Sequence, residues 1–249
     1  MIKAGCCGWA YLRTENFGEM VGNFKWKSKL QLYAKLFDLV EINSTFYKIP
    51  RLSTVEKWRK EADEVNKNFE FTIKCSGIIT HKDRFSSEVS VNAFKQMVEI
   101  ANILRANVLL LQSPASYKPT KENVEKVRDF FKEVDKQGLR ENITVIWEVR
   151  WHVDWPKDIV QKLFSELEIE HCVDPLRQDC FYSRRVVYYR LHGFGKPMYN
   201  YKFSDKELGR IVEKSTMSEK TGRDVYVLFN NATCYDDAIR FKKFLNEHH

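Results

Sequence analysis

Charged side chains at the ends of apolar segments are the residues of this chain that could do chemistry. Glu41 and Glu148 each lie within an apolar segment, where loss of water would raise the pKa of a carboxylate and a cationic neighbour would lower it. Both are therefore candidates for general acid or base catalysis. Lys74, Arg150 and Arg190 are the cationic candidates, and the planar fork of an arginine suits a phosphate or a carboxylate. Each cation has the alternative of a structural ion pair with one of the glutamates.

Lys74 and the histidines extend the chemistry that these segment ends could support. A lysine at a strand end can form a Schiff base with a carbonyl substrate if burial or neighbouring cations lower its pKa. His81 and His192 are candidates for carrying a proton or contacting an oxyanion. The interior histidines, which include His152 and His171, show neither HxH nor HExxH spacing. The sequence therefore predicts no metal site and requires no cofactor, although ligands from distant segments could still converge.

Polar and aromatic residues near the same segment ends are candidates for binding a substrate. They are Trp9, Asn43, Tyr47, Arg150, Asp174, Arg190 and Asn230. Aromatic rings interleaved with basic residues, as at Arg150 and Trp151, can stack nucleic-acid bases. They can equally fill the space between segments, and the sequence leaves both interpretations open.

Short runs of β-branched, aliphatic and aromatic residues are the elements that must position these side chains. Eight are expected as strands: Ile2–Gly5, Leu39–Asn43, Phe69–Lys74, Asn107–Leu111, Ile143–Glu148, Ile169–Val173, Val186–Leu191 and Asp224–Phe229. Several are continuously apolar, as a strand buried on both faces must be. Between most of them, apolar residues recur at helical spacing, as Leu30, Tyr33, Ala34 and Phe37 do.

The alternation of strands with helices predicts a single (β/α)8 barrel over residues 1–249. A doubly wound sheet is the alternative, but the turn after the first strand, residues 5–9, reads GCCGW rather than GxGxxG. Residues 174–185 barely accommodate a helix, so we expect a short, irregular connection between strands six and seven. In such a barrel the candidate residues all follow the carboxyl ends of strands, where active sites lie.

Composition narrows the partners of the protein. The formal net charge of +7 favours anionic small molecules or nucleic acid, but there is no block of five basic residues. No apolar stretch is long enough to cross a membrane, and the N-terminus lacks the features of a signal peptide, so we expect a cytoplasmic protein without a membrane partner. The six cysteines form no CxxC pair, which gives zinc-ribbon and thioredoxin-like folds no support. The oligomeric state is left open.

Several motifs together resemble the YecE-like family, catalogued as domain of unknown function 72. They are GCCGW at 5–9, VEINSTFY at 40–47, FEFTIK at 69–74, WEVR at 147–150, YRLHG at 189–193 and VYVLFNN at 225–231. The resemblance covers nearly the whole chain and implies a TIM-like barrel. It does not imply an established reaction.

For this family, a likeness to the endonuclease IV type of barrel, and with it a role in DNA repair, has been suggested. That type of barrel holds three zinc ions with many histidines and carboxylates, whereas this chain has few histidines. The resemblance therefore leaves a metal-dependent nuclease in doubt, while binding to nucleic acid stays open.

Three hypotheses about function follow. In the first, an enzyme holds a phosphorylated or otherwise anionic substrate with Lys74, Arg150 and Arg190. Glu41 or Glu148 is then the base, His81 or His192 the acid, and Asn43 and Asn230 orient the substrate. In the second, a lyase or aldolase forms a Schiff base on Lys74. In the third, a non-catalytic protein binds nucleic acid through its basic surface.

Overall fold

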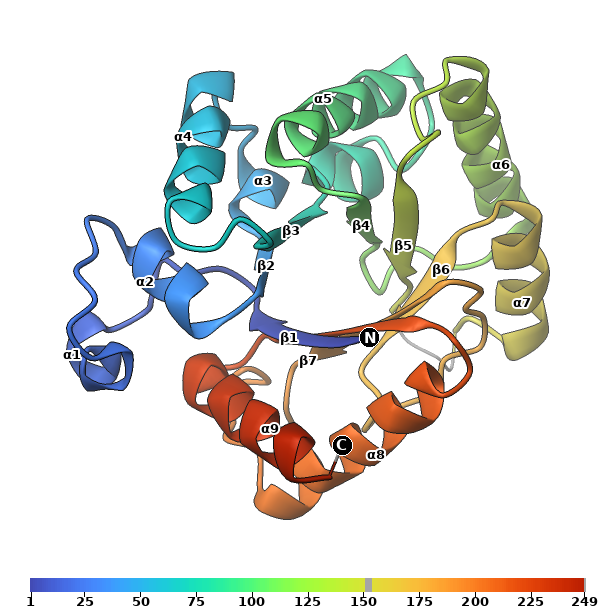
Figure 1. The fold of residues 1–249 in the computed structure, drawn as a ribbon. Coiled ribbons are helices and arrows are strands. Elements are labelled where there is room, and N and C mark those ends of the chain that lie inside the picture. Colours follow the sequence, from blue (N-terminus) through green and yellow to red (C-terminus); the bar gives the residue numbers. More distant parts are fainter. Residues whose placement is uncertain (151–153, 249) are drawn as a thin grey trace.

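Eight parallel strands close into a barrel, which confirms the fold predicted from the sequence. The computed structural model describes residues 1–150 and 154–248. The strands are β1 (Ile2–Cys6), β2 (Leu39–Ile42), β3 (Glu70–Lys74), β4 (Val108–Gln112), β5 (Thr144–Glu148), β6 (Glu170–Val173), β7 (Val186–Leu191) and β8 (Asp224–Phe229). Each pairs with the next along the chain, and β8 pairs with β1 (Figure 1). The observed bounds lie within one residue of the expected ones.

Helices surround the ring of strands (Figure 1). They are α1 (Thr14–Phe17), 3-10 helix η1 (Glu19–Val21), α2 (Lys29–Leu36), α3 (Ser44–Tyr47), α4 (Leu52–Asp63), π-helix η2 (Ile78–Lys82), α5 (Glu88–Leu104), α6 (Lys121–Lys136), α7 (Lys157–Glu166), α8 (Asp205–Glu219) and α9 (Cys234–His248). Residues 174–185, which join β6 to β7, contain turns and no helix.

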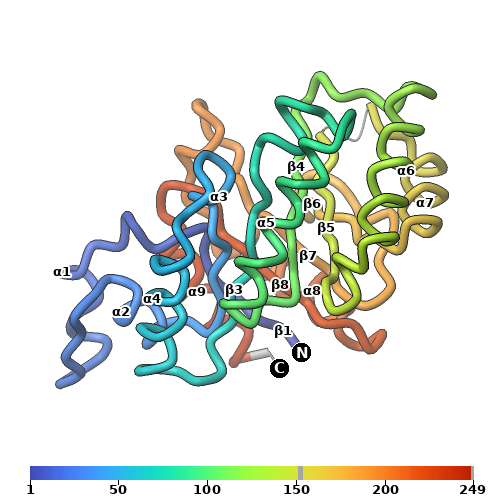
Figure 2. Tube along the Cα trace, turned by 90° about the horizontal axis from the view of Figure 1, so that it is seen from above, coloured from blue at the N-terminus to red at the C-terminus, as the bar shows by residue number. Residues whose placement is uncertain are grey.

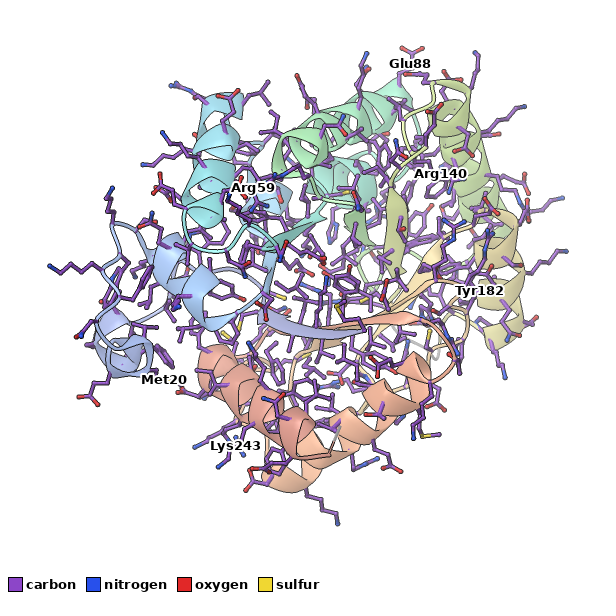
Figure 3. The ribbon with its side chains drawn as sticks, viewed as in Figure 1. Met20, Arg59, Glu88, Arg140, Tyr182 and Lys243 are labelled. Carbon is purple, nitrogen blue, oxygen red and sulfur yellow. The ribbon has the colours of Figure 1, made fainter. Side chains whose placement is uncertain are left out.

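Hydrophobic side chains pack in two places. The larger cluster fills the space between the strands and the outer helices, and Trp147 on β5 and Phe164 on α7 stack there with their ring centroids 5.4 Å apart. A smaller cluster lies inside the ring and includes Leu39, Leu110, Ile146, Tyr188 and Leu228. The side chains drawn in Figure 3 fill the interior of the ring. The interior of the barrel is therefore a packed core rather than a pore.

The N-terminus and the end of α9 lie at the end of the barrel where the strands begin (Figure 2). The N-terminal amine forms an ion pair with Asp224 at the start of β8. The opposite end, where the strands finish, carries the loops that contain the candidate residues. Within the described part of the chain, no helix has both the length and the apolar character needed to cross a membrane.

Candidate functional site

Alternation along the strands brings the candidate residues to one place. Successive side chains of a strand point to opposite faces, so residues two apart share a face. Leu39, Ile146 and Tyr188 point into the barrel. The residues two positions further along the same strands are Glu41, Glu148 and Arg190. The interior side chains thus change from largely apolar to ionic in the layer at the carboxyl ends of these strands.

Arg190 is the centre of this ionic layer. Its Nε and Nη2 atoms donate to the two carboxylate oxygens of Glu41 over 2.9 and 2.8 Å, and its Nη1 donates to Oε2 of Glu148 over 2.5 Å. The side chain of Arg190 is 1% exposed and that of Glu41 is fully buried. Such buried charges are tolerated only because they are paired. The arginine predicted to bind an anion is therefore already engaged by two carboxylates.

Glu148 has further partners in addition to Arg190. Its Oε1 atom accepts hydrogen bonds from Nε2 of Gln112 and Nε of Arg150, each over 3.1 Å, and lies 3.4 Å from Nε2 of His192. Burial by itself would raise the pKa of Glu148, but the charge of Arg190, then His192 and Arg150, lowers this pKa well below its usual range. Glu148 is consequently ionised at neutral pH and is a poor general base there.

Two neighbouring groups complete the ionic layer. The hydroxyl of Tyr188 donates to Glu41 over 3.0 Å, so the Thr72 hydroxyl, 2.7 Å away, must donate to Tyr188. Nδ1 of His192 lies 3.0 Å from the carbonyl oxygen of Arg190, which can only accept. Nδ1 of His192 therefore carries a proton, and its Nε2 lies 3.3 Å from Nη2 of Arg150.

Lys74 at the end of β3 has different surroundings. The residue is 7% exposed, and its ammonium nitrogen lies 4.0 Å from the centre of the Phe46 ring. The ammonium nitrogen makes no hydrogen bond or ion pair with any residue in the described ranges. Burial and, after it, the charge of Arg190 lower the pKa of Lys74 to about 8. About a tenth of this amine is therefore uncharged at pH 7, far more than of an ordinary lysine.

Helix α3 places Phe46 against Lys74. The Thr45 hydroxyl lies 2.9 Å from the carbonyl oxygen of Ile42 and 2.6 Å from that of Lys74, which ties the start of α3 to the ends of β2 and β3. His81 on η2 contacts the same ring edge-on, with centroids 4.9 Å apart. Burial and then the charge of Lys74 lower the pKa of His81 below its ordinary value, so His81 is neutral at pH 7. Lys74 and His81 therefore share one aromatic neighbour.

A cavity of about 720 Å³ opens at this end of the barrel beside Lys74. Four predicted site residues line it, namely Asn43, Tyr47, Lys74 and Asn230. Eight polar residues that the sequence analysis did not select also line it, namely Tyr11, Arg13, Asn16, Tyr199, Asn231, Thr233, Tyr235 and Asp236. Three of these lie in the long segment between β1 and α2, where no periodic pattern marks a function. Asn231 could have been selected from the sequence, since it directly follows the candidate residue Asn230.

A second cavity of about 340 Å³ lies beside the first, on the side of β5, β6 and β7. Glu148, Arg150, Asp174 and His192 are among its lining residues. Asp174 is not a free carboxylate, because it accepts from the backbone N–H of His192 over 3.1 Å and pairs with Arg177 at 3.6 Å.

Trp9 is placed outside both cavities. Its ring packs edge-on against Trp58 of α4 at 5.3 Å and against Phe71 of β3 at 6.5 Å, so it belongs to the core between strand and helix. The interior histidine His171 is buried and accepts a hydrogen bond from the backbone N–H of Phe181 over 3.1 Å. Trp151 and His152 lie outside the described residues.

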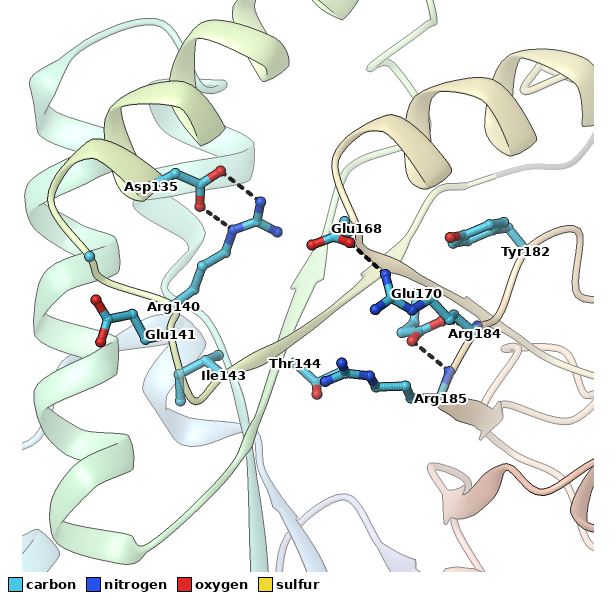
Figure 4. A pocket seen from close by; sticks show the side chains of 11 residues that line it. Asp135, Arg140, Glu141, Ile143, Thr144, Glu168, Glu170, Tyr182, Arg184 and Arg185 are labelled. Atoms are coloured by element: carbon cyan, nitrogen blue, oxygen red, sulfur yellow. Dashed lines mark hydrogen bonds and ion pairs between the residues drawn. The ribbon is translucent and has the colours of Figure 1, made fainter.

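Another cavity, of about 380 Å³, lies at the opposite end of the barrel (Figure 4). Four of its charged side chains are paired with one another, because Arg140 binds Asp135 and Arg184 binds Glu168. Glu170 accepts the backbone N–H groups of residues 184 and 185. We therefore place the candidate site at the end of the barrel that contains Lys74. Across the described ranges, no group of three or more His, Cys, Asp or Glu side chains is arranged to hold a metal ion.

The closed ring of eight parallel strands, with ionisable side chains at their carboxyl ends, defines a protein of the TIM-barrel class. Residues 3–249 match the family described as Protein of unknown function DUF72, and the chain belongs to that family. The resemblance read from the sequence motifs is thereby confirmed.

Known relatives agree with this assignment. The Bacillus subtilis protein YunF is 34% identical over 110 residues, which is 41% of this chain and 37% of that protein. Two solved structures of DUF72 family proteins share the fold. The one from Enterococcus faecalis has a TM-score of 0.77 at 21% identity, covering 99% of this chain and 96% of that one. The one from Thermotoga maritima has a TM-score of 0.75 at 23% identity and covers 99% of both chains.

Proposed function

We propose that this protein is an enzyme that binds a carbonyl substrate covalently, as an imine on Lys74. One observation carries the proposal: a buried amine with a pKa of about 8 faces a cavity and has no hydrogen bond or ion pair within the described residues. An amine must be uncharged to attack a carbonyl carbon, and an ordinary lysine is almost wholly protonated at neutral pH.

The reaction needs a nucleophile and a group that moves protons. The uncharged nitrogen of Lys74 forms a bond to the carbonyl carbon, and the resulting carbinolamine loses water to give the imine. The protonated imine withdraws electrons from the neighbouring carbon, so a proton or a carbon substituent can leave there without its electron pair. His81 is neutral and adjacent, and we assign it the transfer of these protons.

The ionic layer has a positioning role in this proposal. Arg190 pairs with both Glu41 and Glu148, and its charge helps to keep the pKa of Lys74 low. Glu41 and Glu148 are thereby removed from the acid and base roles that their sequence positions favoured. Asn43 and Asn230, which line the cavity, are left to orient the substrate.

A second candidate function is binding of an anionic substrate, such as a phosphorylated compound or a nucleic-acid strand. It is favoured by Lys74 together with Arg13, a second cation that lines the same cavity without an ion pair to the described residues. In that case Lys74 acts as a charged ligand and never forms a covalent bond. Arg190 contributes little, since Glu41 and Glu148 already match its charge.

Trapping with cyanoborohydride tests the proposal. The protein is incubated with glycolaldehyde, glyceraldehyde, dihydroxyacetone or pyruvate, and the reduced adduct is located by peptide mass spectrometry. We expect labelling to concentrate on Lys74 with a pH midpoint near 8, and Lys74→Met to remove it. The exposed Lys243 is the internal control. Labelling spread evenly over surface lysines, with none on Lys74, would contradict imine formation. Stabilisation by inorganic phosphate that Lys74→Met abolishes would favour the anionic alternative.

A further inference from the structure

Polar groups without partners line the cavity beside Lys74. The side-chain amide of Asn230 makes no hydrogen bond to the described residues. Asn231 is 6% exposed, and its Oδ1 atom is buried without a hydrogen-bond partner. Its Nδ2 atom donates to acceptors on Tyr201 and Asp237, each over 2.7 Å, which fixes the orientation of the amide. A buried acceptor left in this way costs free energy unless a ligand supplies a donor.

Tyrosine rings form the rim of the same cavity. Tyr11 is 90% exposed, Tyr47 is 82% exposed and Tyr199 is 41% exposed, and all three line it. Exposed apolar side chains that gather around one cavity, rather than lying scattered singly, mark a candidate binding surface. A tyrosine offers an apolar face to carbon–hydrogen groups and a hydroxyl to polar ones, which suits a ligand that has both.

The charges at the rim argue for a ligand without net charge. Arg13 and Asp236 both line the cavity with opposite charges, and neither has an ion-pair partner among the described residues. Lys74 supplies an amine with a pKa of about 8, and the remaining polar groups of the wall are amides and hydroxyls. Amides and hydroxyls both donate and accept hydrogen bonds, as the hydroxyl groups of a ligand also do.

We propose that the substrate of the Lys74 cavity is a neutral polyhydroxylated carbonyl compound, such as an open-chain sugar. This inference rests on the proposed function, because Lys74 takes the carbonyl carbon. Hydroxyl groups of the chain exchange hydrogen bonds with the side-chain amide of Asn230, and the carbon chain lies against Tyr47 and Tyr11. A cavity of about 720 Å³ has room for such a chain.

The first test measures binding without covalent chemistry. Ribitol and sorbitol carry the hydroxyl groups but no carbonyl, and saturation-transfer NMR detects their contact with the protein. We expect both to bind the wild-type protein. Tyr47→Ala and Asn230→Ala should weaken binding about tenfold, the loss expected for a hydrogen-bonding partner. Tyr182→Ala and Asn246→Ala, at the opposite end of the barrel, are the matched controls and should change nothing.

The second test compares trapping of three-carbon aldehydes. Rates for glyceraldehyde, propanal and glyceraldehyde 3-phosphate are each divided by their rates with free Nα-acetyl-lysine. We expect the normalised rate at Lys74 to be at least about tenfold higher for glyceraldehyde than for propanal. Asn230→Ala should reduce this ratio toward one. Equal rates for glyceraldehyde and propanal, or a preference for the phosphorylated aldehyde, would overturn the inference.

The two tests separate failure of the substrate class from failure of the reaction. Polyol binding without any trapping on Lys74 would contradict imine formation and leave the hydroxyl-binding cavity standing. Trapping without polyol binding and without preference for glyceraldehyde would contradict the polyhydroxylated substrate and leave imine formation on Lys74 standing.

Discussion

The ammonium group of Lys74 faces the Phe46 ring and a cavity rather than a carboxylate. The nearby acids Glu41 and Glu148 are both held by Arg190, and their charges offset only part of the effect of burial and of the Arg190 charge on Lys74. The protonated form is disfavoured, and the pKa falls to about 8. The reactivity of this residue therefore results from how its neighbours are paired.

This pKa makes the stability of the protein depend on pH. The pKa of Lys74 falls from 10.5 to about 8 on folding. Below pH 8 Lys74 is protonated in both the folded and the unfolded protein. Burial of its charge then destabilises the folded state by the full amount, about 3 kcal/mol. Between pH 8 and 10.5 only the unfolded state stays protonated, so this cost shrinks as pH rises. We expect Lys74→Met to raise the free energy of unfolding by up to about 3 kcal/mol at pH 7, and by little at pH 10.5 and above.

Urea unfolding of wild type and Lys74→Met across this pH range measures the effect. Lys243→Met, which removes an exposed lysine from α9, is the control and should show no such trend. A stability difference that stays constant from pH 7 to pH 11 would contradict a lowered pKa at Lys74.

At the scale of the element, the pairing of β1 with β2 depends on Gly5. Gly5 pairs with Leu39 of β2, and a Cβ atom on Gly5 would lie 2.0 Å from the backbone oxygen of Leu39. That oxygen accepts a hydrogen bond from the buried Tyr33 hydroxyl over 2.8 Å, so it is held in place. The close approach of the two strands therefore requires a residue without a side chain.

Gly5→Ala is expected to lower the free energy of unfolding by about 3 kcal/mol, because a backbone atom must move to admit the methyl group. Gly209→Ala is the matched control. Gly209 lies inside α8 with no atom near the position of an added Cβ, so the same change should stabilise by about 1 kcal/mol. Thermal unfolding followed by circular dichroism checks both. Equal effects of the two changes would show that packing at Gly5 does not matter.

At the scale of the whole molecule, the net charge of +7 is the main feature that a polyanion would detect. Much of the surface charge is already paired, as at Arg128 with Glu166 and Arg240 with Asp205. The excess positive charge forms no block of basic residues in the sequence. General attraction without a defined groove is the expected behaviour.

We expect a random single-stranded oligonucleotide to bind weakly, with affinity that falls about tenfold between about 50 and 200 mM salt. Lys74→Met should leave this binding unchanged, because surface charge and not the cavity carries it. Fluorescence anisotropy against salt concentration measures both. Binding that resists salt and is lost in Lys74→Met would instead place the nucleic acid in the cavity.

The sequence by itself determined the eight strands, their parallel order and the end of the barrel at which Glu41, Lys74, Glu148 and Arg190 gather. Strand bounds follow from apolar runs. Residues two apart on a strand share a face. A polar residue two positions after the last interior apolar one therefore lies inside the barrel at the carboxyl ends of the strands. These are local properties of the chain, and local patterns predict them.

Only the tertiary structure decided which of these residues pair. Arg190 binds Glu41, 149 positions earlier in the chain, and Glu148, 42 positions earlier, which leaves Lys74 without an ion pair to any described residue. It also brought Tyr11 and Asn231 to the same cavity from opposite ends of the chain. Pairing across the interior depends on the stagger of the strands and on the paths of the loops. Both arise from contacts between distant segments, which no local pattern of residues records.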